Sequence, residues 1–458
     1  MAPLNRGRVV VFPLPFHGHV NPMLRLAAAL HGRGLAVTVL HADHCAPDPA
    51  AHPAAFRFVP VRADVPAGLM ASLDVAGVVT ALNAIFAAPF KDRLCELLVD
   101  GDGVRCVVTD VVWYSAQTAA RELGVPALGL MTSSAASFRT FVAYPTLLDK
   151  GYLPVQESRK EDPVHELPPF RVKDLQRVDS SSLAGFAGMV ARVVAEARQS
   201  SGLILNTFDA IEAGDVNDIR DNLQSIPVFA VGPLHKLAPP PTKTTSAQDR
   251  AGCLEWLDAQ APRSVLFVSL GTVAAIDARE FAELARGLVG SNRPFLWVVR
   301  PSLVRDTSGK LLHPPVAGVE EEEETRGGRG RIVPWAPQEE VLAHPAVGAF
   351  LTHNGWNSTM EAVSEGVPMI CRPCFGDQLG TARYVCDVWQ VGVEVGDRLE
   401  RGDVKAAIEK VMGGGGAEGK VEVREKMKGL KERTDECANE GGLSYTALTD
   451  LVDLMLSF

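Results

Sequence analysis

The feature that most constrains the fold is a mostly apolar run that leads into a turn and then into a helical pattern, inside residues 335–378. Residues 349–352 lack the alternation of a half-exposed strand, which is typical of a buried parallel strand. An Asn-Gly pair at 354–355 is a turn signal, and the Asn-Ser pair at 357–358 occupies the positions where a helix begins. The pattern predicts a strand–turn–helix unit of a parallel α/β sheet, with free backbone N–H groups at the helix start.

The same segment carries an ordered set of polar and aromatic side chains. Trp335 offers a flat ring, His353 stands beside the helix start, and Glu361 lies about one helical turn further along. A helix N-terminus is a ready anion site, and a carboxylate near it can accept hydrogen bonds from paired ribose hydroxyls. Each residue taken alone fits an ordinary structural role in a βα unit. The ordered set, closed by Asp377 and Gln378, favours a nucleotide-sugar site.

The segment as a whole also resembles a family signature. Residues 335–378 are similar, without a gap, to the 44-residue signature of plant family-1 UDP-glycosyltransferases. The motif FHGHVNP at 16–22 fits the same family, so the resemblance covers nearly the whole chain. The N-terminal half further resembles grass UDP-glucosyltransferases that act on benzoxazinoid hydroxamic acids of the DIMBOA type. The resemblance implies an α/β fold of the GT-B class, in which two Rossmann-like, doubly wound parallel-sheet domains face each other across a cleft.

Length, charge and cysteine usage exclude several other classes of protein. A chain of 458 residues suits two large domains, and a formal net charge of −10 argues against a nucleic-acid partner. The first residues do not form a secretory signal, and no apolar run is expected to approach the roughly 20 residues that cross a bilayer. The eight cysteines are scattered, which indicates reduced thiols. We therefore expect a cytoplasmic protein without a membrane span.

Short β-rich runs alternate with helical patterns, which is typical of parallel, doubly wound sheets. The predicted strands are 8–13, 36–41, 57–60, 105–109, 126–131 and 202–206, followed by 264–269, 295–300, 331–334, 348–352 and 369–371. The predicted helices of the first half include 23–33, 79–98 and 115–123. A stretch rich in Pro, Thr and Lys separates the two series.

This pattern and the resemblance predict four parts of the chain. Residues 1–236 are expected to form an acceptor-binding domain, and residues 251–440 a UDP-sugar-binding domain. Residues 237–250 are expected to be a linker. Residues 441–458 are expected to form a helix that packs back on the N-terminal domain.

His19 and Asp110 are the candidate catalytic pair. His19 follows the first predicted strand on what reads as an exposed loop, and a histidine there can take a proton from a hydroxyl. Asp110 follows the strand at 105–109 and can hold the imidazole in one tautomer. Capping or turn roles are the alternative for both. The resemblance implies that His19, three residues before Pro22, is the base, whereas His17 replaces the glutamine common in relatives.

The resemblance divides the remaining candidates between the two substrates. Thr132 and Thr272 each follow a predicted strand, and Gln378 at the end of the signature favours glucose over galactose. The expected donor-binding residues are Thr132, Thr272, Trp335, Ala336, Gln338, His353, Gly355, Trp356, Asn357, Ser358, Glu361, Asp377 and Gln378. The expected acceptor-binding residues are Phe16, His17, Phe138, Met189 and Phe375, each of which fits a core role equally well.

Several patterns resemble metal or nucleotide motifs without meeting their requirements. Residues 414–420 spell G-x-x-x-x-G-K, but a valine follows in place of Ser or Thr. The C-x-x-C at 371–374 has no second pair, and the D-x-D at 100–102 has no further acidic ligands placed to help it. An acidic run at 320–324 reads as a solvated loop. We expect neither a metal nor a cofactor.

The resemblance, together with the residues that carry it, implies a metal-independent, inverting glucosyltransferase that uses UDP-glucose as co-substrate. It is expected to act as a monomer and to form a β-glucoside on a hydroxyl of a small lipophilic plant metabolite, with no nucleic-acid partner. One alternative is a transferase for another UDP-sugar. A second is a non-catalytic homologue that keeps the UDP-sugar pocket; loss of His19 or Asp110 would favour it, and both are present.

Overall fold

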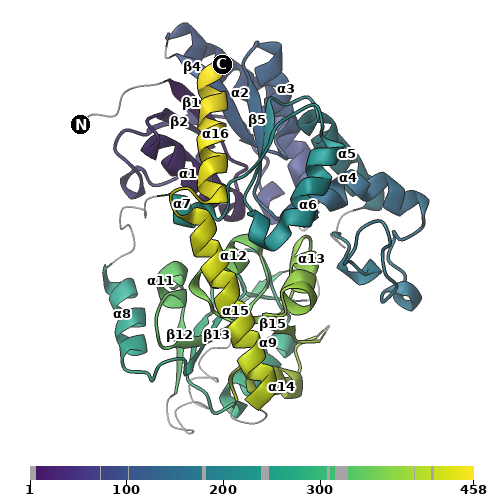
Figure 1. The fold of residues 1–458 in the computed structure, drawn as a ribbon, viewed down its shortest axis with the longest axis vertical. Coiled ribbons are helices and arrows are strands. Elements are labelled where there is room, and N and C mark those ends of the chain that lie inside the picture. Colours follow the sequence, from purple (N-terminus) through teal and green to yellow (C-terminus); the bar gives the residue numbers. More distant parts are fainter. Residues whose placement is uncertain are drawn as a thin grey trace. The chain divides into compact units, whose positions relative to one another are not determined.

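The chain forms two compact units, each with its own parallel sheet (Figure 1). The computed structural model describes residues 7–72, 74–101, 103–177, 182–238, 247–306, 310–314, 329–396, 398–413 and 417–458. Unit 1 comprises Met1–Thr244 and Thr434–Phe458, and unit 2 comprises Thr245–Arg433. Parallel strands alternate with helices in both units, which confirms the predicted α/β class with two Rossmann-like sheets.

Unit 1 is built on a seven-stranded sheet in the order β3-β2-β1-β4-β5-β6-β7, with every neighbouring pair parallel. Its strands are β1 (Arg8–Phe12), β2 (Ala36–Ala42), β3 (Arg57–Val61), β4 (Val104–Asp110), β5 (Ala127–Met131), β6 (Gly202–Leu205) and β7 (Val228–Ala230). The order of addition reverses between β1 and β4. In open α/β sheets, ligands bind beyond the carboxyl ends of the strands at such a reversal.

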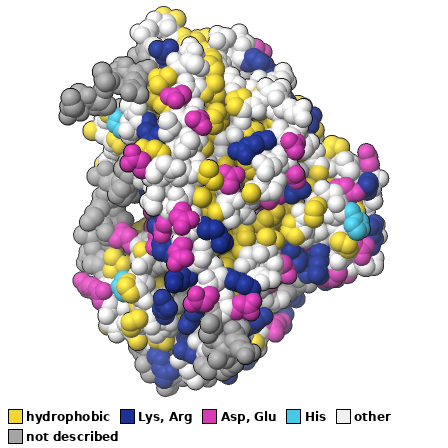
Figure 2. Space-filling model, in the orientation of Figure 1, with side chains coloured by type: hydrophobic (Ala, Val, Ile, Leu, Met, Phe, Trp, Pro, Cys, Tyr) yellow, Lys and Arg dark blue, Asp and Glu magenta, His cyan; other side chains and the backbone are white. Residues whose placement is uncertain are grey.

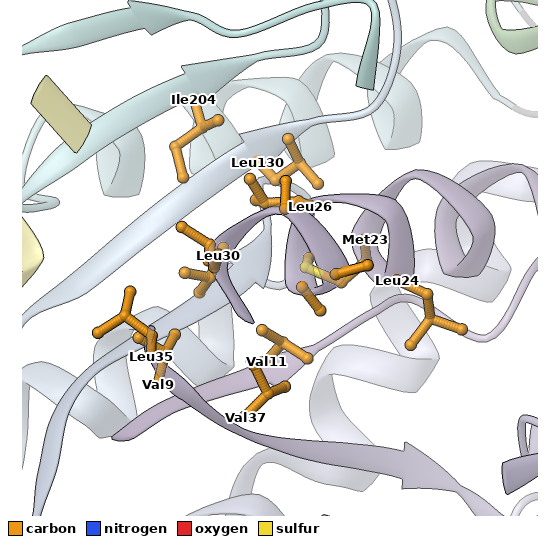
Figure 3. Close-up of a cluster of buried hydrophobic side chains, with 14 of the residues drawn as sticks. Val9, Val11, Met23, Leu24, Leu26, Leu30, Leu35, Val37, Leu130 and Ile204 are labelled. Carbon is orange, nitrogen blue, oxygen red and sulfur yellow. The ribbon is translucent and has the colours of Figure 1, made fainter. Parts of the chain in front are cut away.

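A buried apolar cluster joins β1, β2 and helix α1 in unit 1 (Figure 3). The helices of this unit are α1 (His17–Gly32), α2 (Val75–Val99), α3 (Tyr114–Glu122), α4 (Ala135–Asp149), α5 (Leu183–Ala197), α6 (Asp209–Asn222), α7 (Leu234–Leu237) and α16 (Leu443–Ser457). Val9, Val11 and Val37 are fully buried in the cluster, because a strand covered on both faces reads as a continuous apolar run. Leu451 and Met455 bring α16 into the same cluster.

Unit 2 repeats this plan with a six-stranded parallel sheet in the order β12-β9-β8-β13-β14-β15. Its strands are β8 (Val265–Ser269), β9 (Phe295–Val298), β12 (Gly330–Val333), β13 (Val347–Thr352), β14 (Met369–Cys371) and β15 (Gly392–Glu394), beside a short pair of β10 (Val304–Arg305) and β11 (Leu311–Leu312). Its helices are α8 (Ala247–Asp258), α9 (Ala278–Gly290), α11 (Gln338–Leu342), α12 (Trp356–Glu365), α13 (Gln378–Arg383) and α14 (Arg401–Met412). Helix α15 (Ala417–Ala438) belongs to unit 2 up to Arg433 and to unit 1 from Thr434.

Helix α1 begins earlier than the sequence pattern predicts. The structure starts it at His17, so His19 lies in the first turn of a helix and not on an exposed loop. Gly18 and Pro22 make the segment read as a loop. Pro22 is the sixth residue of this helix, so it leaves the first turn intact and removes only the hydrogen bond that an N–H at position 22 would donate to the Gly18 carbonyl. The catalytic candidate is therefore held by regular structure.

Helix α2 corrects the expectation that no apolar run approaches the length needed to cross a bilayer. By length and composition it is the one described helix that is apolar enough to cross a membrane. Its Leu82, Phe86 and Phe90 are buried, and the helix packs against α3 and α5 of unit 1. These contacts account for part of its apolar character, and a single helix of this kind is weak evidence for a membrane span.

Several predicted segments fall wholly or partly outside the described residues. These are the middle of the expected linker at 239–246, the acidic run at 320–324, residues 414–416 of the P-loop-like pattern and Asp102. Helix α8 already begins at Ala247, within the last residues of the expected linker. The predicted domain boundaries stay a prediction.

On the face shown in Figure 2, basic and acidic side chains are interspersed.

Packing of α16 should contribute strongly to the stability of unit 1. We expect Leu451→Ala to lower the free energy of unfolding by about 2–5 kcal/mol, since it leaves a cavity at a fully buried position. Asp450→Ala on the exposed side of the same helix should change it by less than about 0.5 kcal/mol. Hydrogen exchange of the β1 amides in urea reports the difference. Equal protection in the two variants would show that α16 contributes little to this core.

Candidate functional site

The site residues of unit 1 lie at the carboxyl ends of three neighbouring strands. His19 follows β1, Asp110 ends β4, and Thr132 follows β5. His19 Nδ1 lies 2.5 Å from Asp110 Oδ2 and 3.0 Å from Thr132 Oγ1. The structure therefore brings together three residues that are far apart in the sequence: the two that the sequence analysis selected as a catalytic pair, and Thr132, which it selected as a donor ligand.

The contact between His19 and Asp110 decides the tautomer of the imidazole. The Asp110 side chain is fully buried, whereas that of His19 is 31% exposed. An ionised carboxylate can only accept, so Nδ1–H donates to Asp110 and the basic lone pair of neutral His19 is at Nε2. The backbone N–H of Val112 donates to the second oxygen, Oδ1, at 3.1 Å. This arrangement suits general-base chemistry, because a proton taken up at Nε2 is stabilised by the buried carboxylate.

Two buried polar residues that the sequence analysis missed fix the backbone next to Asp110 and Thr132. Asn83 of α2 donates to the Val112 carbonyl at 2.9 Å and accepts from the Ser115 N–H at 3.0 Å, which fixes the turn after Asp110. The one signal in the sequence for this role of Asn83 is that it is a single amide side chain in an otherwise apolar helical pattern. Without the fold, however, nothing connects residue 83 with residues 112 and 115.

Glu212 is the second such residue, and it caps α4 close to Thr132. Its carboxylate accepts from the N–H groups of Ala135 and Ala136 at 2.9 and 3.0 Å and from Thr207 Oγ1 at 2.6 Å. Burial raises the pKa of Glu212, while these hydrogen bonds favour its ionised form. Its backbone departs from helical geometry inside α6, at φ −138° and ψ 31°. The cap fixes the chain that follows β5, where Thr132 lies.

The predicted acceptor residues are distributed unevenly between surface and core. His17 is exposed in the first turn of α1, and the Phe16 ring lies 6.2 Å from the His19 ring. Phe138 is fully buried against Phe141, and Met189 is 6% exposed, so both occupy core positions. Phe16 and His17 are thus the candidates of unit 1 that neighbour the base and reach the surface.

The donor candidates of unit 2 lie around the predicted strand–turn–helix unit, which the structure contains as β13 and α12. Asn354 occupies the turn with a φ of +61°. Its Nδ2 contacts Cys371 Sγ at 3.1 Å, and its N–H donates to Thr352 Oγ1 at 3.2 Å. Gly355 caps α12 without a side-chain hydrogen bond. The N–H groups of the first turn, at Trp356 and the two residues after it, therefore face an end that an anion can occupy.

His353 lies between two glycines beside this helix end. A Cβ at Gly271 or at Gly355 would lie 2.5 Å from His353 Nε2, so the imidazole fits only because both residues lack side chains. Burial, together with the charge of Arg300, lowers the pKa of His353 to about 4. Its Nδ1 is buried, with no hydrogen-bond partner among the described residues. A neutral imidazole at this position can donate one hydrogen bond to an anion.

A hydrogen-bond network links Glu361, the residue predicted to bind the ribose, to α11. Gln338 Nε2 donates to Glu361 Oε2 at 2.7 Å and to Ser358 Oγ at 2.9 Å. The amide holds the Glu361 carboxylate toward the start of α12, where Asn357 and Ser358 lie. The link connects residues 338 and 361, and only the fold reveals it.

Gln378 is oriented by the backbone next to it. Its Oε1 accepts from the N–H groups of Cys374 at 2.9 Å and Phe375 at 3.2 Å, and its side chain is 5% exposed overall. These contacts assign the amide oxygen to the protein and leave the amide nitrogen as the donor for a ligand. Asp377 precedes it as the N-cap of α13.

The remaining donor candidates differ in exposure. The Trp335 ring is 47% exposed, as a stacking surface requires, and Ala336 beside it is buried. Thr272 is exposed after β8. Trp356 is 3% exposed and packs near Trp389, with ring centroids 6.3 Å apart, so most of its ring is structural. Within the described ranges, no group of three His, Cys, Asp or Glu side chains is placed to hold a metal ion.

The lowered pKa of His353 predicts a dependence of stability on pH. Between pH 6.5 and about 4, the unfolded chain binds a proton at this residue and the folded chain does not, so stability falls as the pH falls through this window. The contribution is at most about 3 kcal/mol. In urea titrations at pH 7 and pH 5, wild type should lose more stability than His353→Gln. An equal loss in both proteins would contradict a lowered pKa of His353.

Comparison with known proteins places this geometry in a family. A model described as "UDP-glucoronosyl and UDP-glucosyl transferase" matches residues 244–417. The DIMBOA UDP-glucosyltransferases BX8 and BX9 of Zea mays are each 57% identical over 99% of this chain, covering 99% and 98% of their own lengths. UDP-glycosyltransferase 76F2 of Arabidopsis thaliana is 41% identical over 98% of this chain and 97% of its own.

Solved structures share the fold over nearly the whole chain. Os79 from O. sativa, solved in complex with UDP, superposes with a TM-score of 0.78 at 27% identity and covers 98% of this chain and 100% of its own. A UDP-glucosyltransferase from Polygonum tinctorium, described as capable of glucosylating indoxyl, gives a TM-score of 0.83 at 27% identity and 99% of both chains. The chain therefore belongs to the UDP-glycosyltransferase family and is an enzyme of the GT-B fold.

Proposed function

We propose that the protein is an inverting glucosyltransferase that transfers glucose from UDP-glucose to a hydroxyl of a small lipophilic acceptor and forms a β-glucoside. The observation that carries this proposal is the 2.5 Å contact between His19 and the buried Asp110. A non-catalytic UDP-sugar-binding homologue has no need of a histidine held in one tautomer at the end of a sheet.

In the proposed reaction, His19 acts as general base. Its Nε2 takes the proton of the acceptor hydroxyl as the oxygen attacks the anomeric carbon of glucose from the face opposite UDP. The glycosidic bond to UDP breaks, and the positive charge gained by the imidazole is stabilised by Asp110. Configuration at the anomeric carbon inverts, so the α-linked donor gives a β-glucoside.

Unit 2 is proposed to bind the donor. Trp335 stacks on the uracil, Ala336 contributes backbone contacts to it, and Glu361, oriented by Gln338, accepts from the ribose hydroxyls. The diphosphate is held at the start of α12, where preorganised N–H groups stabilise the charge that builds up on departing UDP. Residues proposed to contact the diphosphate are Thr272, His353, Gly355, Asn357 and Ser358, and those proposed to contact the glucose are Thr132, Trp356, Asp377 and Gln378.

We further propose that the reaction needs no metal ion, since the helix end and neutral donors can take the part of a cation at the diphosphate. The enzyme is proposed to work as a cytoplasmic monomer. Size-exclusion chromatography with light scattering checks the oligomeric state, and microscopy of a fluorescent fusion checks the compartment.

The acceptor is proposed to be a cyclic hydroxamic acid of the benzoxazinoid class. Support comes from the two maize relatives at 57% identity, whose names identify them as DIMBOA UDP-glucosyltransferases. Phe16 provides an aromatic ring and His17 a polar group next to the base, which suits a flat, hydroxylated ring system.

The direct test is UDP release from UDP-glucose with DIMBOA, with a simple phenol and with a terpenol, each with and without EDTA. Transfer to DIMBOA at a higher kcat/KM than to the other acceptors, unchanged by EDTA, supports the proposal. Binding of UDP-glucose without turnover on any acceptor would favour the non-catalytic alternative. Loss of activity in EDTA that Mg²⁺ or Mn²⁺ restores would contradict the metal-independent mechanism.

Substitution of the base separates its role from that of its neighbour. We expect His19→Ala to lower kcat by about a hundred- to ten-thousand-fold, a typical range for loss of a general base, while the Kd for UDP stays nearly unchanged. His17→Gln is the matched control on the same turn and should keep its activity. Wild-type turnover in His19→Ala, or inactivity confined to His17→Gln, would mean that the base is wrongly assigned.

Choice of sugar is predicted to depend on Gln378. Its amide oxygen is held by two backbone N–H groups, so its amide nitrogen is oriented to donate to hexose hydroxyls. Buried partners left unpaired by a misplaced hydroxyl are costly, so UDP-glucose should be preferred over UDP-galactose. Gln378→His should lower kcat/KM for UDP-glucose more than for UDP-galactose. A ratio that does not move would show that the sugar is recognised by other residues.

A further inference from the structure

Arg300, in the loop after β9, is a half-buried cation that makes all its hydrogen bonds to neutral oxygens. Its Nε donates to the Gly271 carbonyl at 2.7 Å and its Nη1 to Ser302 Oγ at 2.6 Å, and Nη2 donates to the Ala274 carbonyl. Across the described parts of the chain, no Asp or Glu forms an ion pair with it. Burial lowers the pKa of Arg300 to about 10, so it still carries its charge at neutral pH.

Two other arginines of unit 2 with little exposure are paired with carboxylates, whereas Arg305, whose charge acts on Arg300, forms no ion pair within the described residues. Arg372, with 12% of its side chain exposed, pairs with Glu280 at 2.6 Å, and Arg383, with 8% exposed, pairs with Asp387 at 2.6 Å. Such pairing is the rule, because a charge removed from water is costly unless an opposite charge compensates for it. Arg300 and Arg305 depart from this rule, and of the two Arg300 donates to the loop that carries Thr272.

The position of Arg300 connects it with the anion site. The carbonyl that accepts from its Nε belongs to Gly271, and a Cβ on Gly271 would lie 2.5 Å from the His353 ring. One residue thus separates the guanidinium from the imidazole that stands beside the start of α12. The hydrogen bonds to Gly271 and Ala274 also fix the loop that carries Thr272.

We infer that Arg300 is the counter-charge of the donor diphosphate. The described chain supplies no anionic partner for Arg300, and the diphosphate of the UDP-sugar provides one. Departing UDP keeps the same diphosphate. Arg300 is a positioning residue, which acts through its field and through the loop at 271–274. Its charge also opposes protonation of His353, so that imidazole remains a neutral donor. The inference rests on the proposed UDP-sugar site of unit 2.

The inference assigns a specific pattern of affinities. A counter-charge matters for ligands that carry the diphosphate and not for the nucleoside alone. The Kd for UDP should therefore rise by roughly ten- to a hundred-fold in Arg300→Gln, whereas the Kd for uridine should stay within about twofold. Arg300→Lys keeps the charge and should recover most of the UDP affinity. Arg398→Gln removes an exposed arginine of the same unit and should leave both affinities unchanged.

Isothermal titration of UDP and uridine into wild type and these three variants tests the inference. A loss confined to UDP, restored by lysine, supports it. An equal loss for uridine and UDP, or unchanged UDP affinity in Arg300→Gln, would overturn it. If Arg300→Gln does not fold, Arg300→Lys decides: retention of UDP affinity supports the inference, and a parallel loss for uridine and UDP overturns it. Failure of wild type to bind UDP would instead contradict the proposed function itself.

Discussion

The hydrogen bond between His19 and Asp110 is the interaction on which the proposed chemistry of unit 1 depends. It requires a carboxylate at the end of β4, buried where it would be costly without partners, and an imidazole delivered by the first turn of α1. The reversal of strand order between β1 and β4 brings the two strand ends together. Asn83 then fixes the turn that follows the carboxylate. The sheet topology therefore determines which nitrogen of His19 is basic.

The proposed role of unit 2 is to hold the charged diphosphate of the donor, mainly through backbone N–H groups and neutral side chains. Glycine at 271 and 355 lets His353 lie against the start of α12, and burial keeps that imidazole uncharged. Arg300 supplies positive charge one residue away from the imidazole. Electrostatic stabilisation of a leaving group is strongest when donors are fixed before the reaction, and each of these contacts fixes a donor or its support.

The sequence predicts the parts of this arrangement that are local. The strand–turn–helix unit at 349–365 follows from an apolar run, an Asn-Gly turn and a capped helix pattern, and the structure contains it as β13 and α12. The predicted start of α1 was wrong, because Gly18 and Pro22 have the composition of a loop, whereas the structure has Gly18 in the first turn of the helix and Pro22 inside it.

Contacts between distant positions could not be predicted from the sequence. Asn83 with Ser115, Glu212 with Ala135, and Gln338 with Glu361 join segments whose proximity only the folded sheet creates. The orientation of the Gln378 amide depends on backbone N–H groups at 374 and 375, which no residue pattern reports. Arg300 resembled any other arginine at a strand end until its partners proved to be carbonyls and a hydroxyl.

The most direct test of the account is the kcat of Asp110→Asn measured beside its Kd for UDP. An amide at this position fills the same space but no longer favours the Nδ1–H tautomer, and it cannot stabilise the protonated imidazole. The account predicts a fall in kcat of at least about a hundred-fold with the Kd for UDP unchanged, because Asp110 acts only through His19. Full turnover in Asp110→Asn would contradict the claim that the buried carboxylate orients the His19 imidazole and stabilises its protonated form.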